Sequence, residues 1–158
     1  MDKHLQKPLN AQTAPPRTKP SNYPEPFASK MAGRLKRPLG DLFGIEKFGV
    51  NLTELPPNSE SALLHKHSRQ EEFVYILSGH PTLVRENEEV SLSPGMCIGF
   101  IPSSSAHKLV NRTREKVVYL EIGDRALDDQ VTYPKDDLEA RMSAEGKWVF
   151  CHKDGKPY

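Results

Sequence analysis

The sequence has little cysteine and no long apolar run. Its two cysteines, Cys97 and Cys151, are too few for a disulfide framework in a chain of 158 residues, and both have apolar neighbours. No apolar stretch approaches the roughly 18 residues of a membrane-spanning helix, and the mean hydropathy is −0.63. The first residues show no apolar core of a secretory signal peptide. We therefore expect a cytoplasmic protein with buried, reduced thiols and no membrane partner.

An excess of charge of either sign is also lacking, since 22 Lys and Arg offset 21 Asp and Glu to a net charge of +1. This balance, without a helix-turn-helix or basic-aromatic motif, argues against a nucleic-acid partner. The charge is nevertheless uneven. Residues 1–37 hold eight basic and two acidic side chains, whereas the remainder holds fourteen basic and nineteen acidic ones. Such a basic segment can fold onto the acidic body or bind an anionic partner, and the sequence leaves both open.

The sequence shows few helical patterns, and its composition divides the chain into three parts. Residues 1–40 form a proline-rich, basic N-terminal arm that we expect to be partly disordered. Residues 41–125 contain eight short β-branched runs separated by turn signals such as PPNS, SGHP and SPG. Without room for crossover helices, these runs predict an all-β fold, an antiparallel β-barrel or jelly roll. Residues 126–158 predict a β-hairpin extension, turning at SAEGK, that packs on the barrel.

The chemically most informative stretch is HKHSRQEEFVYILSG. His65 and His67 are one residue apart, so in a strand both imidazoles lie on the same face. Two neutral imidazoles are a ready pair of ligands for a divalent metal, and a carboxylate is their natural partner. The stretch offers Glu71 and Glu72, and strand alternation alone says only that one of them points inward.

This stretch resembles the first motif of the cupin superfamily. In that motif a glycine follows the glutamate by seven positions, so Gly79 selects Glu72. PSSSAHKLVN resembles the second motif, which supplies the further histidine, His107, and an asparagine four residues later, Asn111. The resemblance covers residues 45–123, and it identifies the chain as similar to small single-domain cupins.

The resemblance implies a metal site near the mouth of the barrel, with His65, His67, Glu72 and His107 as its four ligands. Such a mixed nitrogen and oxygen site suits one divalent transition metal ion, and Fe, Mn, Ni, Zn, Co and Cu all remain open. Isomerase, lyase and dioxygenase chemistry all occur in similar cupins. We therefore expect a metal-dependent enzyme acting on a small molecule. The alternatives are a non-catalytic module that binds or senses a small molecule, and a barrel that the metal mainly stabilises.

Self-association is a further expectation. Similar cupins are often dimers, and a proline-rich arm can be donated to the edge of a partner's barrel, which would give a homodimer.

The motifs depart from the usual cupin pattern at scaffold positions. Asn58 or Ser59 must make a turn where glycine is usual, and asparagine tolerates left-handed backbone. Ser104 also replaces a glycine, and the second motif is one residue longer than usual, which a bulge at Gly99 could absorb.

The remaining candidate side chains have ordinary structural interpretations. We expect Glu71 to be solvated, although it could also support a ligand imidazole. Tyr75 and Phe100 are expected in the core, with a tyrosine hydroxyl aimed into the pocket as the alternative for Tyr75. His80 and His152 are expected at the surface.

Overall fold

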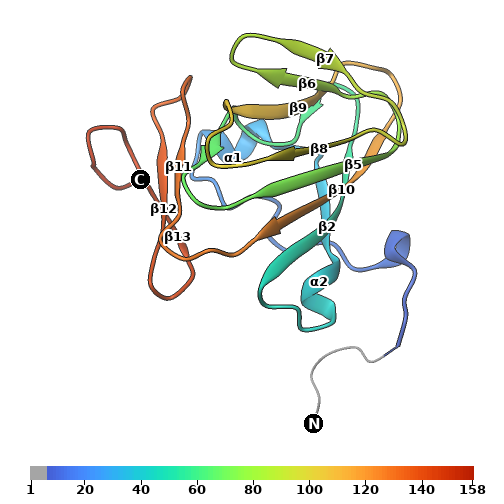
Figure 1. Cartoon of the computed structure of the whole chain (residues 1–158), viewed down its shortest axis with the longest axis horizontal. Coiled ribbons are helices and arrows are strands. Elements are labelled where there is room, and N and C mark those ends of the chain that lie inside the picture. Colours follow the sequence, from blue (N-terminus) through green and yellow to red (C-terminus); the bar gives the residue numbers. More distant parts are fainter. Residues whose placement is uncertain (1–6) are drawn as a thin grey trace.

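The computed structural model describes residues 7–158 and consists mostly of antiparallel strands (Figure 1). The predicted disorder of the N-terminal arm therefore concerns in part residues 1–6, which lie outside the described residues. The helical elements are a 3-10 helix (Ala11–Thr13), α1 (Phe27–Lys30) and α2 (Leu39–Leu42). The strands are β1 (Leu35–Pro38), β2 (Phe48–Leu55), β3 (Ser59–Glu60), β4 (Lys66–His67), β5 (Glu72–Ser78), β6 (Thr82–Arg85), β7 (Glu89–Ser91), β8 (Cys97–Phe100), β9 (His107–Asn111), β10 (Val117–Asp124), β11 (Gln130–Thr132), β12 (Glu139–Met142) and β13 (Trp148–Cys151).

Three sheets build the fold. A five-stranded sheet has the order β1-β2-β10-β5-β8, and a four-stranded sheet has the order β3-β9-β6-β7. Apolar residues from both sheets meet in one core between them: Leu55, Val74, Ile76, Leu83, Leu92, Phe100, Leu109, Val117 and Tyr119. All pairings are antiparallel, so the all-β prediction is confirmed.

Strand β5 shows how alternation sets the inside and the outside of the barrel. Val74 and Ile76 are buried, whereas the alternating residues Phe73, Tyr75 and Leu77 are exposed. Tyr75 is 38% exposed, so its predicted place in the core is wrong. The strand begins at Glu72, and this start sends every odd-numbered side chain to the outer face. Phe100, by contrast, is 3% exposed and lies in the core, as predicted.

The prediction of two buried thiols is also wrong. Cys97 is exposed and Cys151 is half-buried, and both are free. In β8 the inward positions are Ile98 and Phe100, so Cys97 faces outward. Apolar neighbours in the sequence indicated a strand, but they did not say which of its faces a cysteine would take.

Two turns bear on the predicted motifs. Asn58 has φ 58°, so it takes the left-handed backbone that the first motif required of it. Gly99 does not absorb the extra residue of the second motif as a bulge, because β5 and β8 pair in continuous register from Glu72–Phe100 to Tyr75–Cys97. The segment after β8 forms a turn instead, in which the Ser104 amide donates to the Ile101 carbonyl at 2.8 Å.

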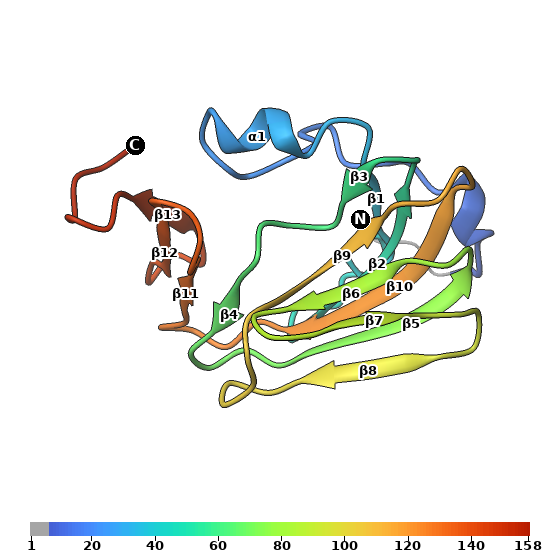
Figure 2. The same ribbon diagram turned by 90° about the horizontal axis from the view of Figure 1, so that it is seen from above.

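The arm and the C-terminal strands pack together beside the barrel (Figure 2). Strands β11, β12 and β13 continue from β4 in a third sheet, with the order β13-β12-β11-β4. A second apolar cluster joins this sheet to the arm: Phe27, Met31, Leu63, Val131, Tyr133, Leu138 and Ala140. The arm also adds β1 to the edge of β2 in its own chain. Within residues 7–158, no helix is long and apolar enough to cross a membrane.

Candidate metal centre

Three separate strands bring the four predicted ligands together. His65 precedes β4 and His67 ends it, Glu72 begins β5, and His107 begins β9. The backbones of His65 and His107 are hydrogen-bonded to each other in both directions, at 3.2 and 2.9 Å. This bridge joins the two sequence motifs, although they are forty residues apart. Glu71, next to Glu72, is exposed, as predicted for a solvated side chain.

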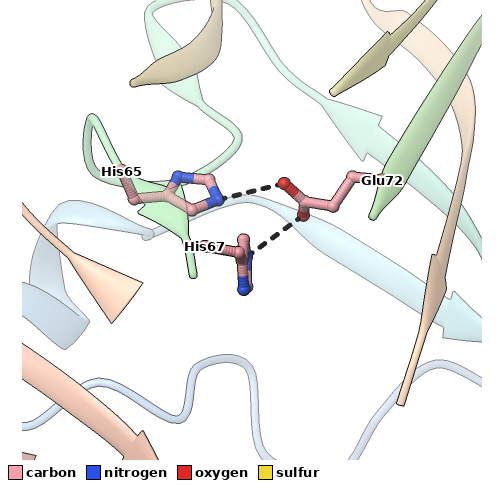
Figure 3. Close-up of side chains that lie close together, drawn as sticks. All are labelled: His65, His67 and Glu72. Atoms are coloured by element: carbon pink, nitrogen blue, oxygen red, sulfur yellow. Dashed lines mark ion pairs between the residues drawn. The ribbon is translucent and has the colours of Figure 1, made fainter. Parts of the chain in front are cut away.

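The Glu72 carboxylate is the point on which the three imidazoles converge. Its oxygens lie 2.9 Å from His107 Nε2, 3.5 Å from His65 Nε2 and 3.6 Å from His67 Nε2. Figure 3 shows His65 and His67 directed toward the two oxygens of this carboxylate. Ligand atoms of His65, His67 and Glu72 all lie within 4.8 Å of one another. The structure thus groups these side chains as possible metal ligands.

Hydrogen bonds on the far side of two rings fix their orientation. His65 Nδ1 lies 2.8 Å from the Leu63 carbonyl oxygen, and His67 Nδ1 lies 2.5 Å from Asp129 Oδ2. Both partners are acceptors, so each Nδ1 carries a proton, and Nε2 of each ring is the atom that would bind a metal. His107 is held differently, since its ring stacks on Phe100 with 3.4 Å between the ring centroids.

Asp129 is a site residue that the sequence did not reveal. It is fully buried, and besides His67 it accepts hydrogen bonds from the Arg69 and Gln70 amides at 2.8 and 3.2 Å. It lies in residues 126–158, which were predicted only to form a β-hairpin extension that packs on the barrel. No motif spacing links it to the histidines, because the pairing of β11 with β4 is what brings it there. A carboxylate that orients a ligand imidazole is a common support in metal sites.

The charges in the site strongly perturb its pKa values. Burial raises the pKa of Glu72, but the histidines outweigh burial and hold this pKa well below its usual range. Burial likewise lowers the pKa of His67, but the hydrogen bonds to Asp129 and Glu72 raise it to about 9. Burial lowers the pKa of His107. Without a metal ion, His67 is therefore protonated at neutral pH, and its positive charge is stabilised by Glu72 and Asp129.

The donor set fits a divalent transition metal. Three imidazole nitrogens of borderline softness lie around one carboxylate, and this combination of donors suits Fe, Mn, Co, Ni, Cu and Zn. The orienting partners of His65 and His67 are in place, as they are behind the ligands of most metal sites.

A cavity of about 250 Å³ opens in front of the four side chains. The arm contributes Tyr23 to its wall, and the C-terminal sheet contributes Trp148, whereas Tyr133 follows β11. Burial raises the pKa of Tyr23 to about 12 and raises that of Tyr133 as well. Both hydroxyls therefore keep their protons at neutral pH.

Known proteins place the chain in a family. Residues 51–123 match the Cupin_2 model, described as a cupin domain. A crystal structure of a sugar phosphate isomerase from a cupin superfamily, from Silicibacter pomeroyi, is 34% identical and superposes with a TM-score of 0.88 over 96% of each chain. A candidate sugar phosphate isomerase from Acidithiobacillus ferrooxidans is also 34% identical, with a TM-score of 0.71 over 79% of this chain and 80% of that one.

Two further similarities are more limited. A polyketide cyclase from Streptomyces resistomycificus shares the fold at 20% identity, with a TM-score of 0.62 over 76% of this chain and 80% of that one. An uncharacterized protein of Methanocaldococcus jannaschii is 38% identical over 55 residues, which are 35% of this chain and 43% of that protein. The chain thus matches less than half the length of this curated relative.

The fold and the site define a small β-barrel protein with a catalytic or binding role of the cupin type. The chain belongs to the cupin superfamily.

Proposed function

We propose that the protein is a metal-dependent enzyme that isomerises a small molecule, with His65, His67, Glu72 and His107 as the metal ligands. The observation that carries this proposal is the convergence of the three Nε2 atoms on the Glu72 carboxylate at the wall of a cavity. Among the reactions open to a cupin, isomerisation is favoured by the similarity to two proteins described as sugar phosphate isomerases, at 34% identity each.

The protein's own groups have separate tasks in this proposal. When bound, a divalent metal supplies a Lewis acid that polarises an oxygen of the substrate. Asp129 and the Leu63 carbonyl hold two of the imidazoles in the tautomer that leaves Nε2 free. The hydroxyls of Tyr23 and Tyr133 keep their protons and donate hydrogen bonds to substrate oxygens. Aromatic side chains of the cavity wall, Trp148 and Phe150 among them, would pack against the bound molecule.

A direct test uses the two adjacent glutamates. Protein reconstituted with each candidate metal is incubated with aldose and ketose phosphates, and the products are followed by NMR. We expect conversion to an isomer of unchanged mass by the wild type and by Glu71→Gln, whose side chain is exposed. Glu72→Gln should lose this conversion. Turnover that is equal in Glu72→Gln and wild type would exclude the proposed site, and metal-loaded protein without any turnover would exclude the isomerase.

A non-catalytic module that binds a small molecule is the second candidate. It is supported by the raised pKa values of Tyr23 and Tyr133, which make both hydroxyls hydrogen-bond donors rather than bases at neutral pH. Thermal stabilisation by a sugar phosphate without any product would favour this role.

We further propose that the protein is a cytoplasmic homodimer. The two free cysteines support a reducing compartment. The outer face of β5 supports self-association, since Phe73, Tyr75 and Leu77 form an apolar row there, each about two-fifths exposed. Beside this row, β8 is the edge strand of its sheet.

A further inference from the structure

The N-terminal arm brings three cations to the cavity that contains the histidines. Arg17, Arg34 and Lys36 all line this cavity. The segments that carry them are joined by a hydrogen bond from the Arg17 amide to the Lys36 carbonyl at 2.9 Å. The basic arm has therefore folded onto the barrel, and it has placed part of its charge inside the proposed site.

The charge of these cations is only partly compensated. Lys36 pairs with Glu121. Arg34 is 8% exposed and donates to backbone carbonyls, among them that of Pro20 at 3.0 Å, and among the described residues it forms no ion pair with a carboxylate. Arg17 also donates to the Pro20 carbonyl, at 3.1 Å. Three positive charges and one negative charge leave the group with an excess of two positive charges.

Unused hydrogen-bond donors accompany this excess of charge. The Nε atoms of Arg17 and Arg34 are buried and have no hydrogen-bond partner. The hydroxyl of Tyr119, on the same cavity wall, is likewise buried and unpartnered. Tyr119 pairs with Thr53 across β10 and β2, and Thr53 pairs with Lys36 across β2 and β1, so the tyrosine and the lysine lie on one face of the sheet.

Like charges gathered in a partly buried wall are costly without an anion. Burial lowers the pKa of Lys36, and its two arginine neighbours lower it further, although Glu121 opposes them. An oxyanion in the cavity would relieve this repulsion and could accept the unused donors. Guanidinium groups bind phosphate and carboxylate through paired hydrogen bonds.

We infer that Arg17, Arg34 and Lys36 form a binding site for the phosphate group of a phosphate monoester, whose remainder reaches the metal centre. The two uncompensated positive charges favour phosphate over carboxylate as the bound group. A phosphate monoester carries a charge of about −1.5 to −2 at neutral pH, which matches this positive excess. The inference rests on the proposed function for the orientation of the substrate, and it names the group by which the substrate is held.

Calorimetric titration of the metal-loaded full chain tests this inference with four probes. Glucose 6-phosphate, glucuronate and glucose share a ring and differ at one carbon, and inorganic phosphate lacks the sugar. We expect glucose 6-phosphate to bind at least tenfold more tightly than the other three. Equal affinity for glucose or glucuronate would overturn the assignment of a phosphate site. Equal affinity for inorganic phosphate would show a site for the free anion, and would overturn the assignment of an ester.

Two variants of the arm identify the binding residues. Arg17→Gln should weaken the binding of glucose 6-phosphate about tenfold or more, as expected for a charge-assisted hydrogen bond. Lys19→Gln removes the same charge from an exposed position two residues away and should leave the affinity unchanged. Arg17→Lys keeps the charge without the planar fork and should give an intermediate affinity. Equal losses in Arg17→Gln and Lys19→Gln would overturn the assignment.

The metal content of the same samples separates this inference from the proposed function. Phosphate binding that depends on Arg17 in a protein that holds no metal would contradict the proposed metal enzyme and leave the phosphate site standing. A metal-loaded isomerase that binds glucose no less tightly than glucose 6-phosphate would contradict the phosphate site alone.

Discussion

At the scale of single residues, the site depends on side chains that orient the proposed metal ligands. Asp129 is fully buried, and its carboxylate lies 2.5 Å from His67 Nδ1. The same carboxylate accepts hydrogen bonds from two backbone amides. These bonds fix both the position of the carboxylate and the tautomer of the imidazole. Asp129 thus acts on the proposed metal through His67, as a positioning residue.

Replacing Asp129 should weaken metal binding without removing a ligand. We expect Asp129→Asn to lower metal affinity about 10–100-fold, the usual cost of losing such a support. The affinity is measured by titration against a competing chelator. Asp137→Asn is the matched control, because Asp137 pairs with His152 at 2.8 Å outside the proposed site. Equal affinity in Asp129→Asn and wild type would contradict the positioning role.

The raised pKa of His67 predicts how the stability of the metal-free protein depends on pH. This pKa is about 9 in the folded chain, against about 6.5 when unfolded. The stabilisation from protonated His67 is then fully present below about pH 6.5 and is lost as the pH rises through about 9. We expect a loss of about 3 kcal/mol in the free energy of unfolding over this range. Denaturant unfolding in chelator measures it, and an equally steep loss in His67→Gln would refute the assignment.

At the scale of elements, strand β5 connects the core to the site. Its inward positions begin with Glu72 and continue with Val74 and Ile76, so one face carries both the ligand and the core. The strand ends at the Gly79 turn, where φ is +80°. A Cβ at this glycine would lie 2.8 Å from the Lys116 carbonyl oxygen and 2.9 Å from Val117. Only glycine fits there, because the turn lies directly against the start of β10.

Two glycine substitutions separate the backbone cost from the steric cost at this turn. Gly95 also has a positive φ, of 89°, but a Cβ there would meet nothing within 4 Å. Gly95→Ala should therefore lose only about 1–2 kcal/mol of stability, the cost of a left-handed alanine. Gly79→Ala should lose clearly more, because the β-carbon also collides with backbone. Thermal or denaturant unfolding measures both, and equal losses would contradict the close approach at Gly79.

The sequence predicted those elements whose residues are constrained by local spacing. The motifs located His65, His67, Glu72 and His107, and the structure brings these four together, because turn geometry and strand alternation act over a few residues. Asp129 was missed because it reaches the site only through sheet pairing between distant segments. The thiols were misplaced for a related reason, since a strand's composition does not say which of its faces points inward.

At the scale of the whole molecule, the arm and the C-terminal sheet complete the cavity. The barrel supplies the four proposed ligands, the arm supplies Arg17 and Tyr23, and the C-terminal sheet supplies Trp148. Tyr23 also packs against Tyr133 and Phe150, with ring centroids 5.8 and 5.9 Å apart. The three parts thus share one apolar cluster and one cavity. A ligand in this cavity would touch segments from both ends of the chain.

The proposed dimer is tested on the apolar row of β5. We expect the wild type to be a dimer by light scattering and Leu77→Glu to be a monomer, because the substitution places a charge in the proposed interface. Val149→Glu is the control, since Val149 is 54% exposed on the separate C-terminal sheet. A monomeric wild type, or a Leu77→Glu variant that stays a dimer, would exclude this interface.

The central claim is that these four side chains hold a metal ion, and the most direct measurement is the metal content per chain. Elemental analysis is made on purified protein after reconstitution and removal of unbound ions, in the wild type, Glu72→Gln and Glu71→Gln. The claim predicts about one transition metal ion per chain in the wild type and in Glu71→Gln, with a clear loss in Glu72→Gln. A wild type that retains no metal, or a Glu72→Gln variant that retains as much as the wild type, would contradict it.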